Sequence, residues 1–366
     1  MFPREIIEYL HSYILEKGFV YSKQVVANFY LSLKTKPFVI LAGISGTGKS
    51  QLVRLFAEAL GHGEHCHLIP VRPDWSDSSY LLGYRNHQGE LVQGQLWKIL
   101  EKAYHHPEVP HFVLLDEMNL ARVEYYLSEV LSLMETRKFS YDRIKTESLQ
   151  IHHDAWHIPD NIYFIGTVNV DEASQSFSRK VLDRANVIEM NDIHLDWPVL
   201  AETEIEVRDP IPNEFLRSRF IQAKDIPQEE RSRYSHVLQM LNQINQILWQ
   251  IELPIGYRIR DDILFYLCYR YEIRELISES EALDLQILQK ILPRIYGHNR
   301  STGEVLYGLI EYLSGKEFEG PRMDYKKVKE VLGDIRKQTY LYPHSLQKLL
   351  TMYKRFEENG YASFWL

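Results

Sequence analysis

The sequence predicts an α/β domain built on a mostly parallel sheet, followed by a smaller α-helical domain. In the first part of the 366-residue chain, short apolar runs typical of buried strands alternate with segments of helical periodicity. After Pro210 and Pro212 the strand-like runs stop and helical periodicity takes over. We therefore expect N-terminal helices over residues 1–36, an α/β domain over 37–209 and a helical region over 210–366.

The elements of the first domain follow from these patterns in chain order. Amphipathic helices are expected over residues 4–15 and 22–33, ahead of a buried strand over 38–42. Further helices are expected over 49–60 and 96–104, and further strands over 66–71, 111–115 and 162–167.

Helical spacing defines the second domain. Apolar residues follow the i, i+3, i+4, i+7 pattern over residues 237–251. Further helices are expected over 261–271, 284–292, 302–313, 325–332 and 345–359.

The composition is that of an ordinary globular protein, with 45% apolar and 25% charged residues. No apolar run reaches membrane-spanning length and the N-terminus mixes charges with apolar residues, so we expect a cytoplasmic protein without a signal peptide. Cys66 and Cys268 are too few for a disulfide framework. The net charge of −8 argues against a nucleic-acid clamp over the whole surface, but leaves a local basic patch possible.

A glycine-rich loop follows the first predicted strand and opens a predicted helix. It reads GISGTGKS over residues 43–50 and fits the P-loop pattern in its required context. Glycines let backbone N–H groups approach phosphates, Lys49 is expected at the β- and γ-phosphates, and Ser50 at Mg²⁺. The candidate nucleotide-binding residues are Gly43, Ser45, Gly46, Thr47, Gly48, Lys49, Ser50 and Gln51.

Two adjacent acids end the predicted strand at 111–115. We expect this strand beside the P-loop strand, with Asp116 holding Mg²⁺ through water and Glu117 polarising the attacking water. A strand capped by two solvated acids is the alternative. The strand at 162–167 leads to Asn169, a candidate to orient the water or, alternatively, a simple turn residue.

These motifs together resemble the AAA+ superfamily, and within it the chain is most similar to McrB-like motor subunits of modification-dependent restriction systems. The resemblance covers roughly residues 20–360 and implies an AAA+ P-loop NTPase core with a helical lid. The residues that carry it are Ala42–Ser50, Leu115–Asn119, Arg122, Met134–Glu135, Gly166–Asn169 and Lys180–Ala185.

The resemblance implies a hexameric ring in which one subunit lends an arginine to its neighbour's nucleotide. Arg184 is the first candidate and Arg179 the second, with a surface salt bridge as the alternative for either. In the lid, Arg258 is favoured over Arg260 to contact the phosphates. The alternative is that both are solvated or paired with neighbouring aspartates.

The sequence departs from the GTP-using members of this family. An arginine expected after the third strand is missing from Asn169–Ser174, so ATP and GTP both stay open. Because 42 residues precede Gly43, we expect recognition of modified DNA to lie on another protein.

Aromatic and histidine clusters have less specific interpretations. For Trp75, Tyr80 and Tyr84 we favour core packing over a substrate contact. Histidines gather at His62, His65, His67 and at His152, His153, His157. Neither group has the second spaced set of Cys or His that closes a zinc site, so no zinc site is predicted.

The leading functional hypothesis is a Mg²⁺-dependent subunit that hydrolyses ATP or GTP, forms a ring and drives a separately encoded partner. The resemblance suggests a McrC-like nuclease subunit in defence against foreign DNA, with DNA contacted indirectly or through the ring pore. Alternatives are a MoxR-like remodelling chaperone and a nucleotide-switched scaffold. Glu117 argues against the scaffold, because a pure switch needs no water-activating base.

Overall fold

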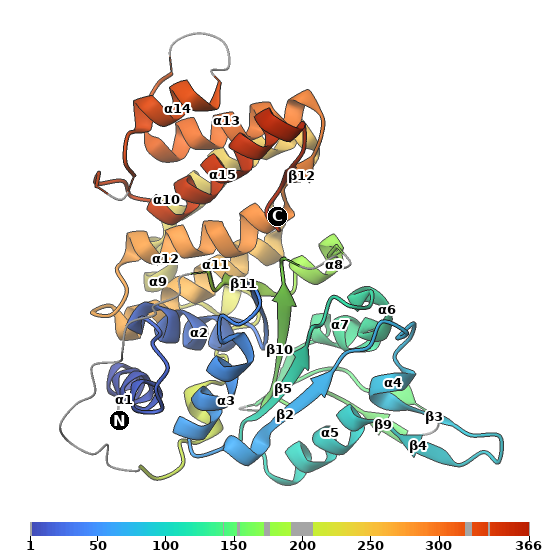
Figure 1. The fold of residues 1–366 in the computed structure, drawn as a ribbon. Coiled ribbons are helices and arrows are strands. Elements are labelled where there is room, and N and C mark those ends of the chain that lie inside the picture. The colour runs from blue at the N-terminus through green and yellow to red at the C-terminus, as the bar shows by residue number, and fades with distance from the viewer. Residues whose placement is uncertain are drawn as a thin grey trace. The chain divides into compact units, whose positions relative to one another are not determined.

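The computed structural model describes residues 2–141, 143–151, 154–171, 176–191, 208–318, 324–335 and 337–365. The chain divides into two compact units, Met1–Ile221 and Gln222–Leu366 (Figure 1). Within the described residues, no helix combines the length and the apolar composition needed to cross a bilayer.

A five-stranded parallel sheet forms the centre of the first unit, in the order β11-β1-β10-β5-β2. Its strands are β1 (Phe38–Gly43), β2 (Cys66–Pro70), β5 (His111–Asp116), β10 (Ile162–Asn169) and β11 (Asn186–Glu189). Every residue of β1 is buried, as expected for a parallel strand with both faces covered.

The helices of this unit precede these strands or connect them. They are α1 (Pro3–Glu16), α2 (Lys23–Thr35), α3 (Lys49–Ala59), α4 (Ser79–Leu82), α5 (Gln95–His105), α6 (Val123–Tyr126), α7 (Ser128–Glu135) and α8 (Arg179–Leu182), with short 3-10 turns at Gly63–His65 and Asn213–Phe215. Figure 1 shows α3 on one side of the sheet and α5 and α7 on the other. Edge-to-face contacts link Phe56 of α3 to Phe29 of α2 and to Phe112 of β5, with ring centroids 5.0 and 6.3 Å apart.

Three antiparallel hairpins extend from this core. They pair β3 (Gly83–Arg85) with β4 (Leu91–Gln93), β6 (Lys138–Ser140) with β7 (Arg143–Lys145), and β8 (Leu149–Ile151) with β9 (Asp154–Trp156). The sequence patterns predicted none of these strands, because three residues are too few to show alternation.

The strand order corrects one expectation. The acidic strand β5 is not beside the P-loop strand β1, because β10 lies between them and pairs with both. In this register Asn169 lies opposite Gly43 and Gly166 lies opposite Leu115. The strands are parallel, so their carboxyl ends still meet at one edge of the sheet.

The second unit is mainly helical. Its helices are α9 (Gln228–Arg233), α10 (Ser235–Leu248), α11 (Tyr257–Arg270), α12 (Glu279–Gln286), α13 (Arg300–Ser314), α14 (Tyr325–Leu332) and α15 (Pro343–Asn359). Short 3-10 turns lie at Ala223–Asp225, Trp249–Ile251, Tyr271–Ile273 and Leu292–Arg294, and a π-helical turn at Ile287–Ile291. A two-residue pair, β12 (Tyr296–Gly297) with β13 (Ala362–Ser363), corrects the expectation that this region has no strands.

Two buried charged residues of the second unit, Lys290 and Asp284, have clear partners. Lys290 forms an ion pair with Asp262, with Nζ 2.9 Å from Oδ2. Asp284 accepts hydrogen bonds from the backbone N–H groups of His344 and Ser345, at 2.7 and 2.8 Å, and so caps the start of α15. Burial raises the pKa of the Asp284 carboxyl, while these hydrogen bonds oppose that shift.

Candidate nucleotide-binding site

The glycine loop connects β1 to α3 in a conformation that requires glycine. Gly46 and Gly48 have φ angles of 83° and 82°, in the left-handed region where other residues are strained. Gly48 is also approached by the side chain of Tyr21, whose hydroxyl donates a 2.8 Å hydrogen bond to the Gly48 carbonyl. A Cβ at Gly48 would lie 2.3 Å from that hydroxyl oxygen. Local backbone and tertiary packing therefore both exclude a side chain here.

Lys49 lies along the inside of the loop. Its Nζ donates hydrogen bonds to the carbonyls of Gly43 and Ile44, at 3.0 and 2.7 Å, and the residue is only 6% exposed. Thr47 donates from Oγ1 to the Ile44 carbonyl at 3.1 Å. The lysine charge is thus held at the loop that a triphosphate would enter.

One backbone N–H group of the loop already donates a hydrogen bond to a carboxylate. The N–H of Ser45 points at Asp171, with the amide nitrogen 3.3 Å from each carboxylate oxygen. Asp171 follows the end of β10 and is exposed. Because P-loop amides are anion donors, Asp171 satisfies a group that a phosphate oxygen can also use.

Asp116 and Ser50 meet across the sheet edge. Ser50 Oγ donates to Asp116 Oδ1 at 2.8 Å, and Thr167 Oγ1 donates to the same oxygen at 2.7 Å. Both Ser50 and Asp116 are partly exposed. A serine hydroxyl and a carboxylate at this spacing are hard oxygen donors, the class that Mg²⁺ prefers, so the residues fit that ion.

Glu117 has an unusual backbone conformation beside this pair. Its φ angle is 52°, a left-handed value that costs energy for a residue with a side chain. Its N–H donates to Thr167 Oγ1 at 3.0 Å, and Asn169 Nδ2 donates to its Oε1 at 3.3 Å. Strained residues of this kind occur preferentially where position matters for chemistry. Here Thr167 holds the Glu117 backbone and Asn169 holds its carboxylate.

Arg184 makes its contacts within its own chain. Its Nε donates to the Leu131 carbonyl at 2.9 Å, its Nη1 donates to the Lys180 carbonyl, and its Nη2 pairs with Glu135. It is buried, whereas Arg179, at the start of α8, is exposed. Of the two candidate arginines, only Arg179 is exposed in this conformation.

The lid arginines lie at the start of α11. Arg260 pairs with Asp261 and lies over the ring of Tyr257, 4.9 Å from its centroid. Arg258 is exposed. For Arg260 this matches the alternative of a local aspartate pair.

Three residues of the site were not assigned from the sequence: Tyr21, Thr167 and Asp171. Thr167 could have been assigned to the site from the sequence, because it lies two residues before Asn169 and therefore points to the same face of the strand. No sequence pattern points to Tyr21, because its contact with Gly48 joins residues that are 27 positions apart in the chain.

The expectation of core packing is wrong for two of the three aromatic residues in the segment after β2. Tyr80 and Tyr84 are 40% and 51% exposed, and Tyr84 lies on β3, which pairs with β4 alone among the described strands. Trp75 is partly buried. It stacks on Tyr80 with ring centroids 5.6 Å apart and meets Tyr126 edge to face.

Comparison with known proteins gives two family matches. Residues 38–185 match the AAA domain of the dynein-related subfamily, and residues 204–361 match a domain of unknown function. The Type IV methyl-directed restriction enzyme EcoKMcrB subunit of Escherichia coli K12 is 27% identical over 149 residues. That match covers 39% of this chain and 32% of the relative, so the chain spans about a third of the relative's length.

Among solved structures, a protein of Cytophaga hutchinsonii that carries the provisional name of an ATPase matches at 14% identity. It has a TM-score of 0.40, and the match covers 90% of this chain and 85% of the other. The family match spans the strands and motifs that form the site, from β1 to Ala185. Residues 38–185 therefore form an AAA domain, and the chain is similar over 149 residues to the EcoKMcrB subunit.

Proposed function

We propose that this chain binds and hydrolyses a nucleoside triphosphate, ATP or GTP, with Mg²⁺. The observation that carries the proposal is the meeting of two pairs at one sheet edge, Ser50 with Asp116 and Glu117 with Asn169. They come from the P-loop helix, β5 and β10, so a phosphate at the loop would face all four groups. In open α/β sheets this edge is where ligands bind.

Phosphate binding is assigned to the loop and its lysine. The backbone N–H groups from Gly46 to Ser50 and the start of α3 attract negative charge. Lys49, now hydrogen-bonded to two loop carbonyls, would exchange one of these for a phosphate oxygen. The exchange replaces a neutral acceptor with a charged one, which strengthens the hydrogen bond.

Ser50 and Asp116 would hold Mg²⁺, which neutralises negative charge on the phosphate oxygens when bound. Glu117 is assigned as the base that takes a proton from the attacking water, and Asn169 as the residue that fixes the orientation of the carboxylate. Thr167 supports both acids, because its hydroxyl donates to Asp116 and accepts from the N–H of Glu117.

The protein is further proposed to work as a hexameric ring with an arginine supplied in trans. Arg179 is exposed, whereas Arg184 is buried and first has to leave Glu135 and the carbonyls of Leu131 and Lys180. Arg258, exposed at the start of α11, is proposed to sense the bound nucleotide from the lid.

The partner proposed for this motor is a separately encoded nuclease subunit of the McrC type, in defence against foreign DNA. Support comes from the similarity to the EcoKMcrB subunit, which extends over 149 residues. The product of a neighbouring gene, added with DNA, tests this directly. Stimulated NTP turnover together with DNA cleavage supports the nuclease partner, and stimulation without cleavage favours a remodelling role.

Hydrolysis itself is tested with Glu117→Gln. The amide keeps the shape and the contact with Asn169 but cannot take a proton, so steady-state turnover of ATP or GTP should fall by about 10²- to 10⁴-fold. Nucleotide affinity, measured by equilibrium binding, should stay within a few fold. Glu101→Gln, at an exposed position on α5, is the matched control. Wild-type turnover in Glu117→Gln would show that the base is assigned incorrectly.

A further inference from the structure

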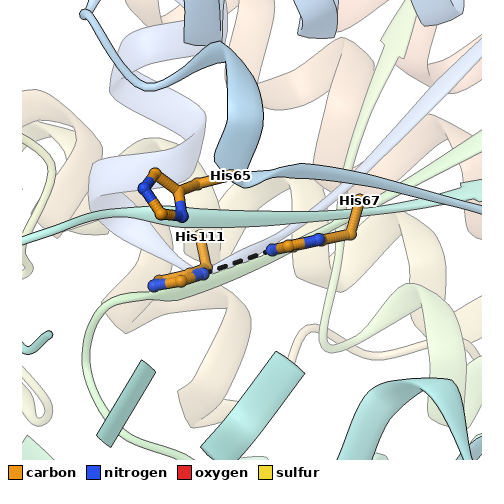
Figure 2. Close-up of side chains that lie close together, drawn as sticks. All are labelled: His65, His67 and His111. Carbon is orange, nitrogen blue, oxygen red and sulfur yellow. Dashed lines mark hydrogen bonds between the residues drawn. The ribbon is translucent and has the colours of Figure 1, made fainter. Parts of the chain in front are cut away.

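Three histidines meet at the edge of the sheet opposite the nucleotide site. His65 ends the 3-10 turn before β2, His67 lies on β2 and His111 begins β5. One ring nitrogen from each lies within 4.8 Å of the other two (Figure 2). Asp116 ends the strand that His111 begins, so about 17 Å of extended chain separates this cluster from the Mg²⁺ candidates.

The parallel register explains why the side chains converge. His67 lies opposite Val113, and aligned residues of neighbouring strands point to the same face of a sheet. His111 is two residues before Val113, so it shares that face. The sequence grouped His65 and His67 with His62, whereas in the structure the third histidine of the cluster is His111, brought there by strand pairing.

The distances suit a metal ion. His67 Nε2 lies 3.2 Å from His111 Nδ1, and Figure 2 shows the two rings end to end along this line. Two nitrogens bound tetrahedrally at about 2.0–2.1 Å from Zn²⁺ are roughly 3.3 Å apart. The His65 ring stands over the His111 ring at 66°, with centroids 4.6 Å apart. His65 is partly exposed, so it has room for the small shift that full ligation needs.

The three imidazoles lie in a desolvated part of the sheet. Burial lowers the pKa of His67 to about 4 and that of His111 to about 3. The charge of Lys102 also lowers the pKa of His67, and the neighbouring histidines also lower that of His111. Burial also lowers the pKa of His65. An imidazole binds a metal through the one nitrogen that carries its lone pair, while the other nitrogen keeps its proton.

Each histidine offers one nitrogen to the cluster. His111 is 0% exposed and offers Nδ1, which lies within hydrogen-bond distance of His67 Nε2, and a metal ion would replace that hydrogen bond. Its other nitrogen, Nε2, has no hydrogen-bond partner among the described residues. His65 Nε2 lies 3.5 Å from the Glu64 carboxylate, the outer partner that metal-binding histidines usually have, and this leaves Nδ1 of His65 for a metal.

We propose that His65, His67 and His111 form a binding site for a divalent transition-metal ion, with Zn²⁺ as the best-suited ion. Imidazole nitrogens favour Zn²⁺, Ni²⁺ and Cu²⁺ over Mg²⁺, and three protein ligands leave a fourth position for water. The ion would link the edge strand β2 to β5 and so stabilise the end of the sheet remote from the nucleotide. The site is independent of the proposed hydrolysis.

The test uses tag-free full-length protein stripped with a chelator and kept free of nucleotide and Mg²⁺. Co²⁺ is the probe, because its visible absorption reports low-symmetry nitrogen coordination, and Zn²⁺ is then added as competitor. We expect one Co²⁺ per chain, an absorption band that Zn²⁺ abolishes, and a higher melting temperature with Zn²⁺.

Two variants assign the ligands. His65→Gln and His67→Gln change partly exposed residues and should each weaken Zn²⁺ binding by about a hundredfold or more, since loss of outer-shell partners alone costs 10- to 100-fold. His105→Gln, at an exposed histidine on α5, should bind as the wild type does. The proposal is overturned if the wild type shows no Co²⁺ band, or if both cluster variants bind Zn²⁺ as tightly as His105→Gln.

Discussion

Ser50 and Asp116 are joined by a 2.8 Å hydrogen bond although 66 residues separate them in the chain. The bond links the start of the P-loop helix to the end of β5 across the intervening strand β10. Thr167, from that intervening strand, donates to the same carboxylate oxygen. A single acid thus connects three elements at the sheet edge where we place the triphosphate.

Replacing Asp116 with Asn should separate the charge of this acid from its hydrogen bonding. The side-chain amide oxygen can still accept from Ser50 and Thr167, so the fold should be retained. Loss of the negative charge should weaken Mg²⁺ binding and lower NTP turnover by about a hundredfold or more. Turnover measured over a Mg²⁺ titration checks this, with Asp77→Asn at an exposed site as the control. Unchanged turnover at every Mg²⁺ concentration would contradict the assignment.

Asp171→Asn should raise nucleotide affinity. The Asp171 carboxylate accepts from the Ser45 amide and places negative charge at the loop, where it competes with phosphate. Neutralising an exposed charge of this kind should tighten nucleotide binding by roughly 2- to 5-fold, and the gain should shrink at high salt. Equilibrium binding at low and high ionic strength measures both effects. Weaker binding in the variant would show instead that Asp171 supports the binding-competent loop.

The two candidate arginines should differ in what their loss affects. Arg184→Gln removes an ion pair to Glu135 and leaves buried carbonyls poorly satisfied, so the free energy of unfolding should fall by about 1–3 kcal/mol. Arg179→Gln is a change at an exposed position and should leave stability nearly unchanged while lowering turnover by about 10³-fold or more.

Mixing inactive subunits shows whether an arginine acts in trans. In mixed rings of Arg179→Gln and Asp116→Asn, some interfaces combine an intact arginine with an intact metal site. These interfaces should restore part of the turnover, whereas neither variant alone does. No recovery in verified mixed oligomers would rule out Arg179 as the arginine acting in trans.

Tyr21→Phe should loosen the P-loop. The variant loses the hydrogen bond from the tyrosine hydroxyl to the Gly48 carbonyl but keeps the ring, and one neutral hydrogen bond contributes about 1 kcal/mol. The free energy of unfolding of the first unit, measured by denaturant titration, should fall by about that amount. Tyr141→Phe, at a fully exposed tyrosine, should show no change. Equal stability of the two variants would mean that the hydroxyl contact contributes nothing.

Stability should decrease as the pH falls below about 6.5. Burial lowers the pKa of His62 from its ordinary value of 6.5, and the hydrogen bond to the Ile211 carbonyl only partly opposes this shift. Below pH 6.5 the unfolded chain therefore binds more protons at this residue than the folded chain, which favours unfolding.

Melting temperatures between about pH 7.5 and about pH 5.5 test this expectation. His62→Gln keeps a donor for the Ile211 carbonyl but does not titrate, so its melting temperature should depend less on pH than that of the wild type. His87→Gln, at an exposed histidine, serves as the control. A pH profile of His62→Gln identical to the wild type would assign the dependence to other groups.

The sequence by itself determined the features that depend on neighbouring residues. The glycine loop before α3, the acids after β5 and the helix α14 at Tyr325–Leu332 were all predicted from local patterns. Periodicity and loop chemistry are short-range properties, so a single sequence carries them. The sequence patterns did not predict the fifth strand, β11. It has only four residues and is polar at both ends, so it shows little alternation of apolar and polar residues.

Tertiary structure alone decided which distant residues meet. It placed β10 between β1 and β5, brought Thr167 and Tyr21 to the site, turned Arg184 inward and added His111 to His65 and His67. Such contacts depend on strand order and register, which follow from packing the whole sheet. No local pattern encodes them, because the same strands in another order would keep every motif and lose these contacts.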